Sequence, residues 1–195
     1  MSEEISRRFF CRAALALPLF CLSQRQSVTE ATPACLSDTP TPEETEGPYF
    51  KPRSPERRSL LEPGIEGRHL VLSGLVMTTG CVPVSRAVLD FWHADASGEY
   101  DNSGFHLRGH QFTDDRGRYR LETIVPGVYP GRTRHIHVKV QASGTPILTS
   151  QLYFPGEVRN QTDWLFRRDL LVMVIDVGKA MRARFDFVLV GATGS

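Results

Sequence analysis

The chain has 195 residues, a net charge of +1, 41% hydrophobic residues and 23% charged residues. This length suits one domain with an appendage, and it is long enough to bury a hydrophobic core. A charge so close to zero gives no electrostatic reason to expect binding to nucleic acid or to an anionic membrane surface. No apolar run approaches the roughly 18–20 residues that a membrane-spanning helix needs, so we expect no membrane span.

The N-terminal residues have the pattern of a targeting signal. Residues 6–10 read SRRFF and precede a short apolar segment over residues 13–20. A basic stretch followed by a short apolar one is typical of a signal peptide, and paired arginines in this context resemble the twin-arginine type. We interpret residues 1–34 as a signal peptide with a polar spacer and expect export to the periplasm or the exterior. The alternative is a disordered or amphipathic start of a cytoplasmic protein.

The cysteine pattern agrees with an exported protein. Cys11 and Cys21 lie within the expected signal, which leaves Cys35 and Cys81 as an even pair in an oxidising compartment. We predict a disulfide between Cys35 and Cys81 that ties the N-terminal arm to the turn at residues 80–83. The chain has no Cys-x-x-Cys motif, so a structural zinc knuckle is not expected.

The remainder of the chain predicts an all-β fold. Residues 35–68 are rich in Pro, Glu, Thr and Arg with little periodicity, which indicates an extended N-terminal arm. Strand signals then follow at residues 69–77, 87–93, 118–123, 135–141, 147–154, 170–177 and 183–190. Short strands separated by regular turn signals are typical of a β-sandwich or barrel. We predict a β-sandwich of about seven to eight strands with long loops over residues 69–195, with at most one helical turn near residues 162–168.

One strand carries two histidines on the same face. From His135 onward apolar and polar residues alternate, which places His135 and His137 on one face and Ile136 and Val138 on the other. Residues two positions apart on a strand are about 6.6–7 Å apart along its axis, and imidazoles at that spacing can converge on one ion. The open alternative is a pair of ordinary surface histidines.

The loop before this strand brings further polar side chains. Pro126 and Pro130 lack an N–H, so this segment is neither a helix nor a central strand. We interpret it as an ordered loop that delivers Tyr129 and Arg132 beside the histidine strand. The alternative is a tyrosine that merely packs in the loop.

A second cluster supplies another phenol. Residues 89–100 leave a strand and enter a glycine-containing loop that ends in Tyr100. The candidate metal ligands are then two phenols and two imidazoles: Tyr100, Tyr129, His135 and His137. Zinc sites favour His, Cys and carboxylate ligands, and non-haem Fe(II) oxygenases favour two His and one carboxylate. A free phenol has a pKa near ~10, so only a strong Lewis acid such as Fe(III) would hold two phenolates at neutral pH.

These motifs resemble those of the intradiol ring-cleavage dioxygenases that act on catechol, protocatechuate and hydroxyquinol. The matching segments are residues 45–49, 83–84, 89–100, 107–109, 113–114, 126–137 and 151–156. Together they span roughly residues 43–157, and the signal-like start is most similar to the exported bacterial branch. The helical dimerisation region typical of catechol-type members has no counterpart here, and a homo-oligomer stays open.

The resemblance implies a fold, a cofactor and a reaction. It implies one Fe(III) per chain, held by the two tyrosines and two histidines, and cleavage of a catechol-type ring with O2 to a cis,cis-muconate-type diacid. In this interpretation Tyr129 is first a ligand and then a base, Arg132 stabilises negative charge on the ring, and Gln151 orients the metal surroundings. The resemblance places Tyr49 and Arg108, with Arg132, along the substrate pocket. Arg134 stands where many relatives have a small residue or proline.

Two other functions stay open from the sequence. A non-catalytic exported β-sandwich binding module would keep the fold without the metal, and a zinc hydrolase would use a different ion on the same fold. A visible band from an Fe(III)-phenolate would distinguish the dioxygenase from the binding module. Catechol-dependent O2 uptake would distinguish it from the zinc hydrolase.

Overall fold

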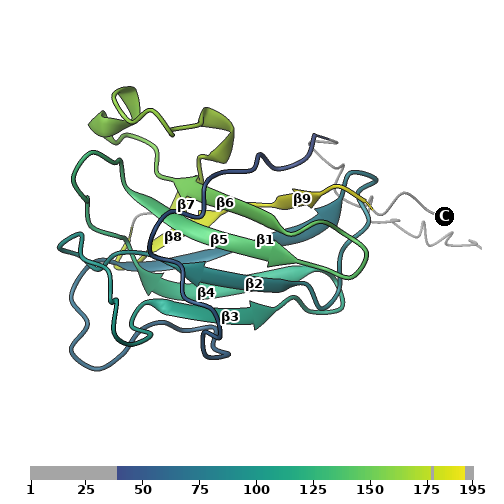
Figure 1. Ribbon diagram of the computed structural model, residues 1–195, viewed down its shortest axis with the longest axis horizontal. Helices are drawn as coiled ribbons and strands as arrows, with labels where there is room; N and C mark the ends of the chain where they lie inside the picture. Colours follow the sequence, from purple (N-terminus) through teal and green to yellow (C-terminus); the bar gives the residue numbers. More distant parts are fainter. Residues whose placement is uncertain (1–38, 177, 192–195) are drawn as a thin grey trace, which may run out of the picture. The chain divides into compact units, whose positions relative to one another are not determined.

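The computed structural model describes residues 39–176 and 178–191 (Figure 1). In this part of the chain the elements are β1 (His69–Thr78), β2 (Val88–Trp92), β3 (Arg108–Phe112), β4 (Arg118–Ile124), β5 (His135–Gln141), β6 (Leu148–Tyr153), η1 (Val158–Gln161), η2 (Arg168–Leu170), β7 (Met173–Asp176), β8 (Met181–Arg184) and β9 (Phe187–Leu189). The predicted all-β sandwich is confirmed. The expected signal peptide and Cys35 lie outside the described residues, so the export signal and the disulfide stay predictions. No helix in the described part is long and apolar enough to cross a bilayer.

The strands form two sheets that enclose the hydrophobic core. One sheet has the order β4-β1-β8-β7, with β9 also pairing with β1, and the other is the antiparallel sheet β3-β2-β5-β6. Leu72 and Leu121 from the first sheet and Leu89, Ile136 and Val138 from the second are fully buried in one cluster. Alternate residues of β1, β2, β4 and β5 therefore face this cluster, as expected for a sandwich.

Two elements differ from the sequence prediction. Strand β3 was not predicted, because its sequence RGHQF has no apolar alternation and contains Gly109. The predicted strand at residues 183–190 is divided into β8 and β9, which both pair in parallel with β1 on either side of Gly74. A Cβ at Gly74 would lie 1.8 Å from the Phe185 carbonyl oxygen, and the Asp186 carboxylate accepts the Leu75 N–H at 2.9 Å. The register on β1 is the same on both sides of this interruption, so a pattern that looks continuous in the sequence becomes two short strands without a bulge.

The predicted helical turn near residues 162–168 is a single hydrogen-bonded turn, in which the Phe166 N–H donates to the Asp163 carbonyl at 3.1 Å. The short 3₁₀ helices η1 and η2 lie at its two ends. Neither helix has a side-chain cap, and only Leu170 among their residues is buried. The segment between them is instead fixed by side-chain contacts to the site described below.

The arm covers the outer face of the four-stranded sheet. Its Glu44 N–H bonds the Thr149 carbonyl of β6 at 2.8 Å, and its Arg57 N–H bonds the His110 carbonyl of β3 at 2.8 Å. Between these two anchors the arm crosses the sheet, as Figure 1 shows for the dark blue segment. The face of β5 that carries His135 and His137 points away from the hydrophobic core and lies under this arm. Both faces of β5 are therefore buried.

Candidate metal centre

The two histidines of β5 meet at their Nε2 atoms. His135 and His137 are almost fully buried, and their Nε2 atoms lie 3.1 Å apart. His135 Nδ1 donates to the Thr133 carbonyl at 2.7 Å, which leaves Nε2 with a free lone pair. Burial lowers the pKa of His135 to about 4, and burial lowers the pKa of His137 well below its usual range. Both imidazoles are therefore neutral at pH 7, the form that binds metals, and the Nδ1 contact is typical of metal-binding histidines.

Two loops bring the tyrosines to this pair. Tyr100 Oη lies 3.3 Å from His135 Nε2. The ring centroid of Tyr129 lies 6.3 Å from that of Tyr100 at an interplanar angle of 88°, and 6.5 Å from that of His135. The Asp95 carbonyl accepts the N–H of Gly127 at 2.6 Å, which joins the Tyr100 loop to the Tyr129 loop. The structure thus brings together all four residues that the sequence selected.

This donor set fits a highly charged metal ion. Burial raises the pKa of Tyr100 far above its usual value, and the nearby guanidinium groups of Arg132 and Arg108 offset only part of that increase. Tyr100 would therefore stay protonated unless a strong Lewis acid replaced its proton. The described residues contain no group of three or more His, Cys, Asp or Glu side chains able to hold a metal. Tyr100 Oη, at 3.3 Å from His135 Nε2, is a further protein donor available to a metal at this position.

Aromatic packing fixes the orientation of the ligands. The ring of Tyr49 stacks on Tyr100 at 4.2 Å and stands edge-on to Tyr129 at 6.0 Å. His137 stacks on Trp92 at 4.9 Å and 7°, and a Cβ at Gly47 would lie 3.3 Å from His137 Cε1. The arm therefore touches both a phenol and an imidazole of the cluster. Trp92 of β2 is buried on the face of its strand that carries the site.

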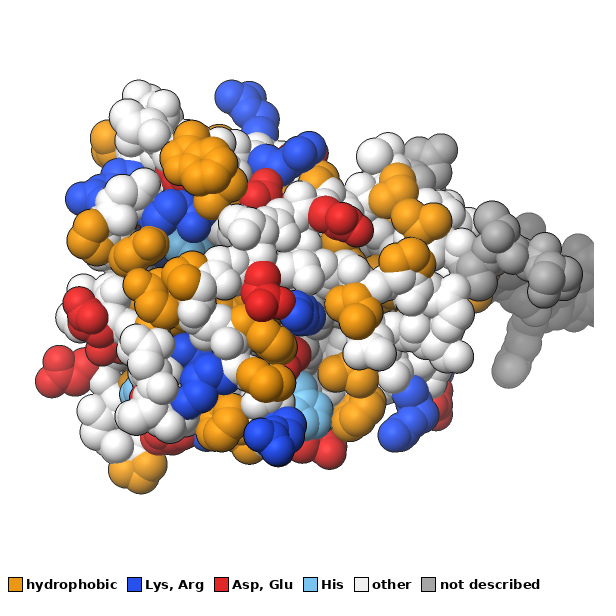
Figure 2. Space-filling view, in the orientation of Figure 1, with side chains coloured by type: hydrophobic (Ala, Val, Ile, Leu, Met, Phe, Trp, Pro, Cys, Tyr) orange, Lys and Arg blue, Asp and Glu red, His pale blue; other side chains and the backbone are white. Residues whose placement is uncertain are grey.

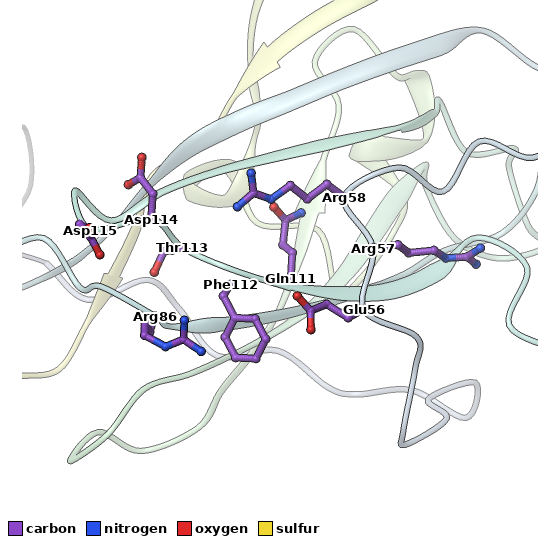
Figure 3. Close-up of a pocket in the computed structure, with 9 residues that line it drawn as sticks. All are labelled: Glu56, Arg57, Arg58, Arg86, Gln111, Phe112, Thr113, Asp114 and Asp115. Atoms are coloured by element: carbon purple, nitrogen blue, oxygen red, sulfur yellow. The ribbon is translucent and has the colours of Figure 1, made fainter.

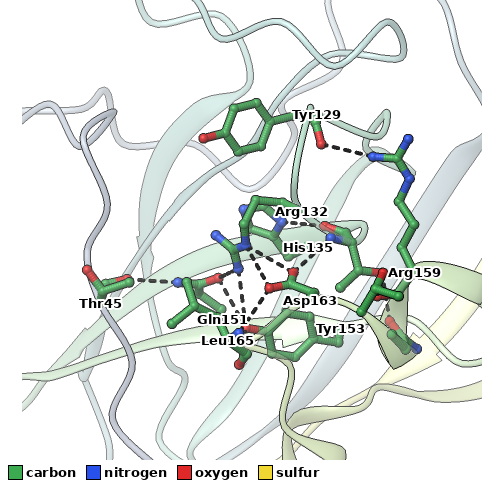
Figure 4. Close-up of polar contacts among 12 residues, drawn as sticks. Thr45, Tyr129, Arg132, His135, Gln151, Tyr153, Arg159, Asp163 and Leu165 are labelled. Atoms are coloured by element: carbon green, nitrogen blue, oxygen red, sulfur yellow. Dashed lines mark hydrogen bonds and ion pairs between the residues drawn. The ribbon is translucent and has the colours of Figure 1, made fainter.

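Arg132 is held in a polar network beside the histidines (Figure 4). Its Nε lies 2.9 Å and 3.1 Å from the two carboxylate oxygens of Asp163, which is almost fully buried. Its Nη2 donates to Gln151 Oε1 at 2.6 Å and to Tyr153 Oη at 3.4 Å. Gln151 Nε2 in turn donates to the Thr45 carbonyl of the arm at 2.9 Å. Arg132 and Gln151, both predicted near the metal, are thus directly bonded to one another.

Arg108 lies near the Tyr100 ring. Its guanidinium carbon lies 5.9 Å from the centroid of the Tyr100 ring, and the side chain is almost fully buried. Its nitrogens donate to the backbone carbonyls of Asp101 and Tyr49. The described contacts of Arg108 brace the arm against the Tyr100 loop, and its predicted role in substrate binding stays a prediction. Arg134 forms an ion pair with Glu157 at 2.9 Å.

Asp163 and Tyr153 were missed by sequence reasoning. Asp163 is 31 residues from Arg132 in an irregular segment, so no periodicity connects the two. Tyr153 lies inside the matching segment 151–156, but no role was predicted for it; its Oη donates to the Leu165 carbonyl at 2.9 Å. Both residues hold the segment between η1 and η2 against Arg132.

An open hollow among the described residues lies away from this cluster (Figure 3). It has a volume of about 690 Å³ and is lined by Glu56, Arg57, Arg58, Arg86, Gln111, Phe112, Thr113, Asp114 and Asp115. It lies near the Phe112 end of β3, whereas the cluster of tyrosines and histidines lies near the Trp92 end of β2, which pairs with the opposite end of β3. On the face shown in Figure 2, positive and negative side chains are interspersed, with no large field of one sign.

Comparison with known proteins assigns the class. The profile of the Dioxygenase family matches residues 45–191. The chain is 29% identical to a chlorocatechol 1,2-dioxygenase of Pseudomonas sp. (strain P51), over 74% of this chain and 68% of that protein. It is 32% identical to a protocatechuate 3,4-dioxygenase beta chain of Burkholderia cepacia, over 64% of this chain and 66% of that one. The curated relatives share between 52 and 68% of their length with this chain.

Solved structures agree with that assignment. The dioxygenase domain of a dioxygenase carbohydrate-binding protein fusion from Streptomyces sp. SirexAA-E is 56% identical with a TM-score of 0.77, over 79% of this chain and all of that one. The 3-chlorocatechol 1,2-dioxygenase of Rhodococcus opacus 1CP is 27% identical with a TM-score of 0.72, over 77% and 73%. The chain belongs to the intradiol ring-cleavage dioxygenase family, whose members found here are oxidoreductases.

Proposed function

We propose that this chain is a non-haem Fe(III)-dependent intradiol dioxygenase. It cleaves a catechol-type ring between the two hydroxyl-bearing carbons with O2 and yields a cis,cis-muconate-type diacid. The observation that carries the proposal is the convergence of two buried neutral imidazoles and two phenols on one point of the sheet face. The relatives named for catechol, chlorocatechol and protocatechuate dioxygenases support the substrate class.

The residues that would hold one ferric ion are Tyr100, Tyr129, His135 and His137. When bound, the ion supplies Lewis-acid activation of the diol toward O2. Two phenolates and one hydroxide balance the charge of such an ion, and a buried site needs that balance.

The other residues position the substrate and move its protons. Both phenols are half-buried, but the Tyr100 ring stacks on Tyr49 and has the Arg108 guanidinium nearby, whereas Tyr129 meets Tyr49 only edge-on. As the resemblance of its loop to the family motif implies, Tyr129 Oη would be the phenol oxygen that accepts a proton from the incoming diol, while Tyr100 keeps its place. Arg132 presents a fixed positive charge to the negative charge that develops on the ring. The arm, packed on Tyr100 and His137, limits the access of water to the reacting atoms.

The test combines the iron content, the visible absorption spectrum and the rate of O2 consumption. Iron-loaded protein should contain one iron per chain, show a visible charge-transfer band, and consume O2 with catechol, protocatechuate or hydroxyquinol. Tyr129→Phe should weaken the band and slow turnover. Tyr119→Phe is the matched control, because its phenol bonds the Phe185 carbonyl in the core at 2.8 Å. A colourless iron-replete protein would favour a non-catalytic binding module instead.

Export and the disulfide complete the proposal. The twin-arginine-like start at residues 6–10 supports export, and the even pair of Cys35 and Cys81 supports a bridge. Replacing Arg7 and Arg8 by Lys should retain the protein in the cytoplasm. Titration of the denatured exported protein should find no free thiol, and two thiols per chain would contradict the bridge.

A further inference from the structure

We propose that Asp163 is the positioning residue for the catalytic guanidinium of Arg132, an inference that rests on the function proposed above. Asp163 lies within the residues 45–191 that the family profile covers but after the short motifs of the sequence analysis, which end at residue 156, and nothing in the sequence pattern selects it. The structure places its carboxylate against Arg132 Nε with both oxygens within 3.1 Å (Figure 4). Asp163 touches neither histidine nor tyrosine of the cluster in the described contacts, so it acts through Arg132.

The carboxylate is itself rigidly held. The backbone N–H groups of Thr133 and Leu165 donate to its two oxygens at 2.8 Å and 3.0 Å. The side chain is 1% exposed, compared with 12% for Arg132. A buried carboxylate with two backbone donors and one guanidinium has its lone pairs satisfied and little freedom to rotate. Asp163 is therefore a fixed anchor rather than a mobile surface partner.

The anchor determines which guanidinium nitrogen is available. Nε is used by Asp163, and Nη2 is used by Gln151 and Tyr153. Among the described residues no protein group accepts from Nη1 of Arg132. Because the guanidinium is planar, fixing Nε and Nη2 fixes the direction of Nη1. Nη1 is the nitrogen that remains to donate to negative charge on the bound ring.

The same segment offers a matched control. Glu157 pairs with Arg134 Nε at 2.9 Å, but both side chains are about one quarter exposed. This second arginine–carboxylate pair has similar chemistry, the same segment of chain and much weaker burial. A substitution of Glu157 therefore distinguishes a specific effect on Arg132 from a general loosening of the segment.

The first measurement needs no iron and no substrate. In metal-free protein, the Nε–H signal of Arg132 in a ¹H–¹⁵N NMR spectrum is assigned by its loss in Arg132→Gln. Its hydrogen exchange should be at least about tenfold slower than that of Arg134 Nε–H, since burial protects it. Asp163→Asn should remove this protection, and Glu157→Gln should leave it intact. Equal exchange at Arg132 and Arg134 in the wild-type protein would overturn the proposal even if Asp163→Asn failed to fold.

The second measurement is kinetic. Asp163→Asn should keep the visible band and lower kcat about 10–100-fold with KM changed by less than about threefold, the effect of misplacing a catalytic group. Glu157→Gln should leave both constants unchanged. Adding Asp163→Asn to Arg132→Gln should lower kcat no further, because the two residues act as one unit.

The outcomes distinguish the two proposals. An active wild-type enzyme with unchanged kcat in Asp163→Asn, or additive losses in the double variant, would overturn the positioning role. A wild-type protein that consumes no O2 with any of the diols, yet loses Arg132 protection in Asp163→Asn, would retain the positioning role and overturn the dioxygenase function.

Discussion

Gly98 lies at one of the points where the two tyrosine loops touch, and its replacement by Ala tests how the site is built. Gly98 has a φ of +94°, and a Cβ there would lie 2.5 Å from the Val128 carbonyl oxygen and 3.0 Å from its carbon. The clash is with backbone, so it can be relieved only by separating the Tyr100 loop from the Tyr129 loop. We expect Gly98→Ala to lower both stability and iron binding.

The magnitude has two parts. A left-handed conformation costs a non-glycine residue about 1–2 kcal/mol, and forcing an extra carbon into packed surroundings costs about 1–3 kcal/mol. The sum is about 2–5 kcal/mol, which lowers Tm by about 4–20 °C in a domain of this size. Gly64 has a φ of +81° with nothing within 4 Å of a Cβ, so Gly64→Ala carries only the first part.

The assay is thermal unfolding of both variants, followed by iron content and the visible band after loading. Gly64→Ala should lose about 2–8 °C and keep its iron, whereas Gly98→Ala should lose more and bind less than one iron per chain. If the two variants have the same Tm and the same iron content, the contact between the loops does not shape the site.

Three further predictions concern the ligands, the core and acid stability. His135→Ala should abolish iron binding, and full iron content after dialysis would refute its role as a ligand. Thr113→Val should lower the free energy of unfolding by about 1–3 kcal/mol in urea titration, because the buried hydroxyl bonds the Ala87 N–H at 2.8 Å and the Val84 carbonyl at 2.7 Å. Burial lowers the pKa of His93 to about 4 from 6.5. The unfolded chain therefore takes up a proton below pH 6.5 that the folded chain refuses until about pH 4, and metal-free protein should lose about 3 kcal/mol across that window from this group. His93→Gln should flatten the decline, and an unaltered pH dependence would contradict it.

The sequence was most informative where a residue's role depends on its neighbours along the chain. The alternation after His135 correctly separated Ile136 and Val138, which are in the core, from the two histidines. The glycine and proline residues near Tyr100 and Tyr129 correctly placed both tyrosines in loops. These features depend on strand periodicity and on backbone restrictions, which act over a few residues.

It was least informative where a role depends on distant partners. Edge strand β3 has no alternation because the Arg108 side chain is buried through bonds to backbone carbonyls, and because the next residue is Gly109, where a Cβ would lie 2.7 Å from Cγ of Arg57 in the arm. Asp163 is 31 residues from Arg132, and only the folded chain shows that its carboxylate is buried against that side chain. Neither feature has a local pattern, so no window of sequence predicts it.

The location of the site on the sheet explains how stability and chemistry are separated. The apolar side chains of β2 and β5 enter the core, whereas the site residues of the same strands point to the opposite face and are buried by the arm. Burial there comes from Gly47, Tyr49 and Phe50 of the arm, which pack against His137, Tyr100 and Trp92. A substitution such as Phe50→Ala should therefore admit water to the imidazoles and weaken iron binding while the sandwich keeps its fold. In Phe50→Ala the iron content should fall, whereas the Tm of the metal-free protein should stay close to that of the wild type. A parallel loss of both would show that the arm is part of the hydrophobic core that stabilises the fold.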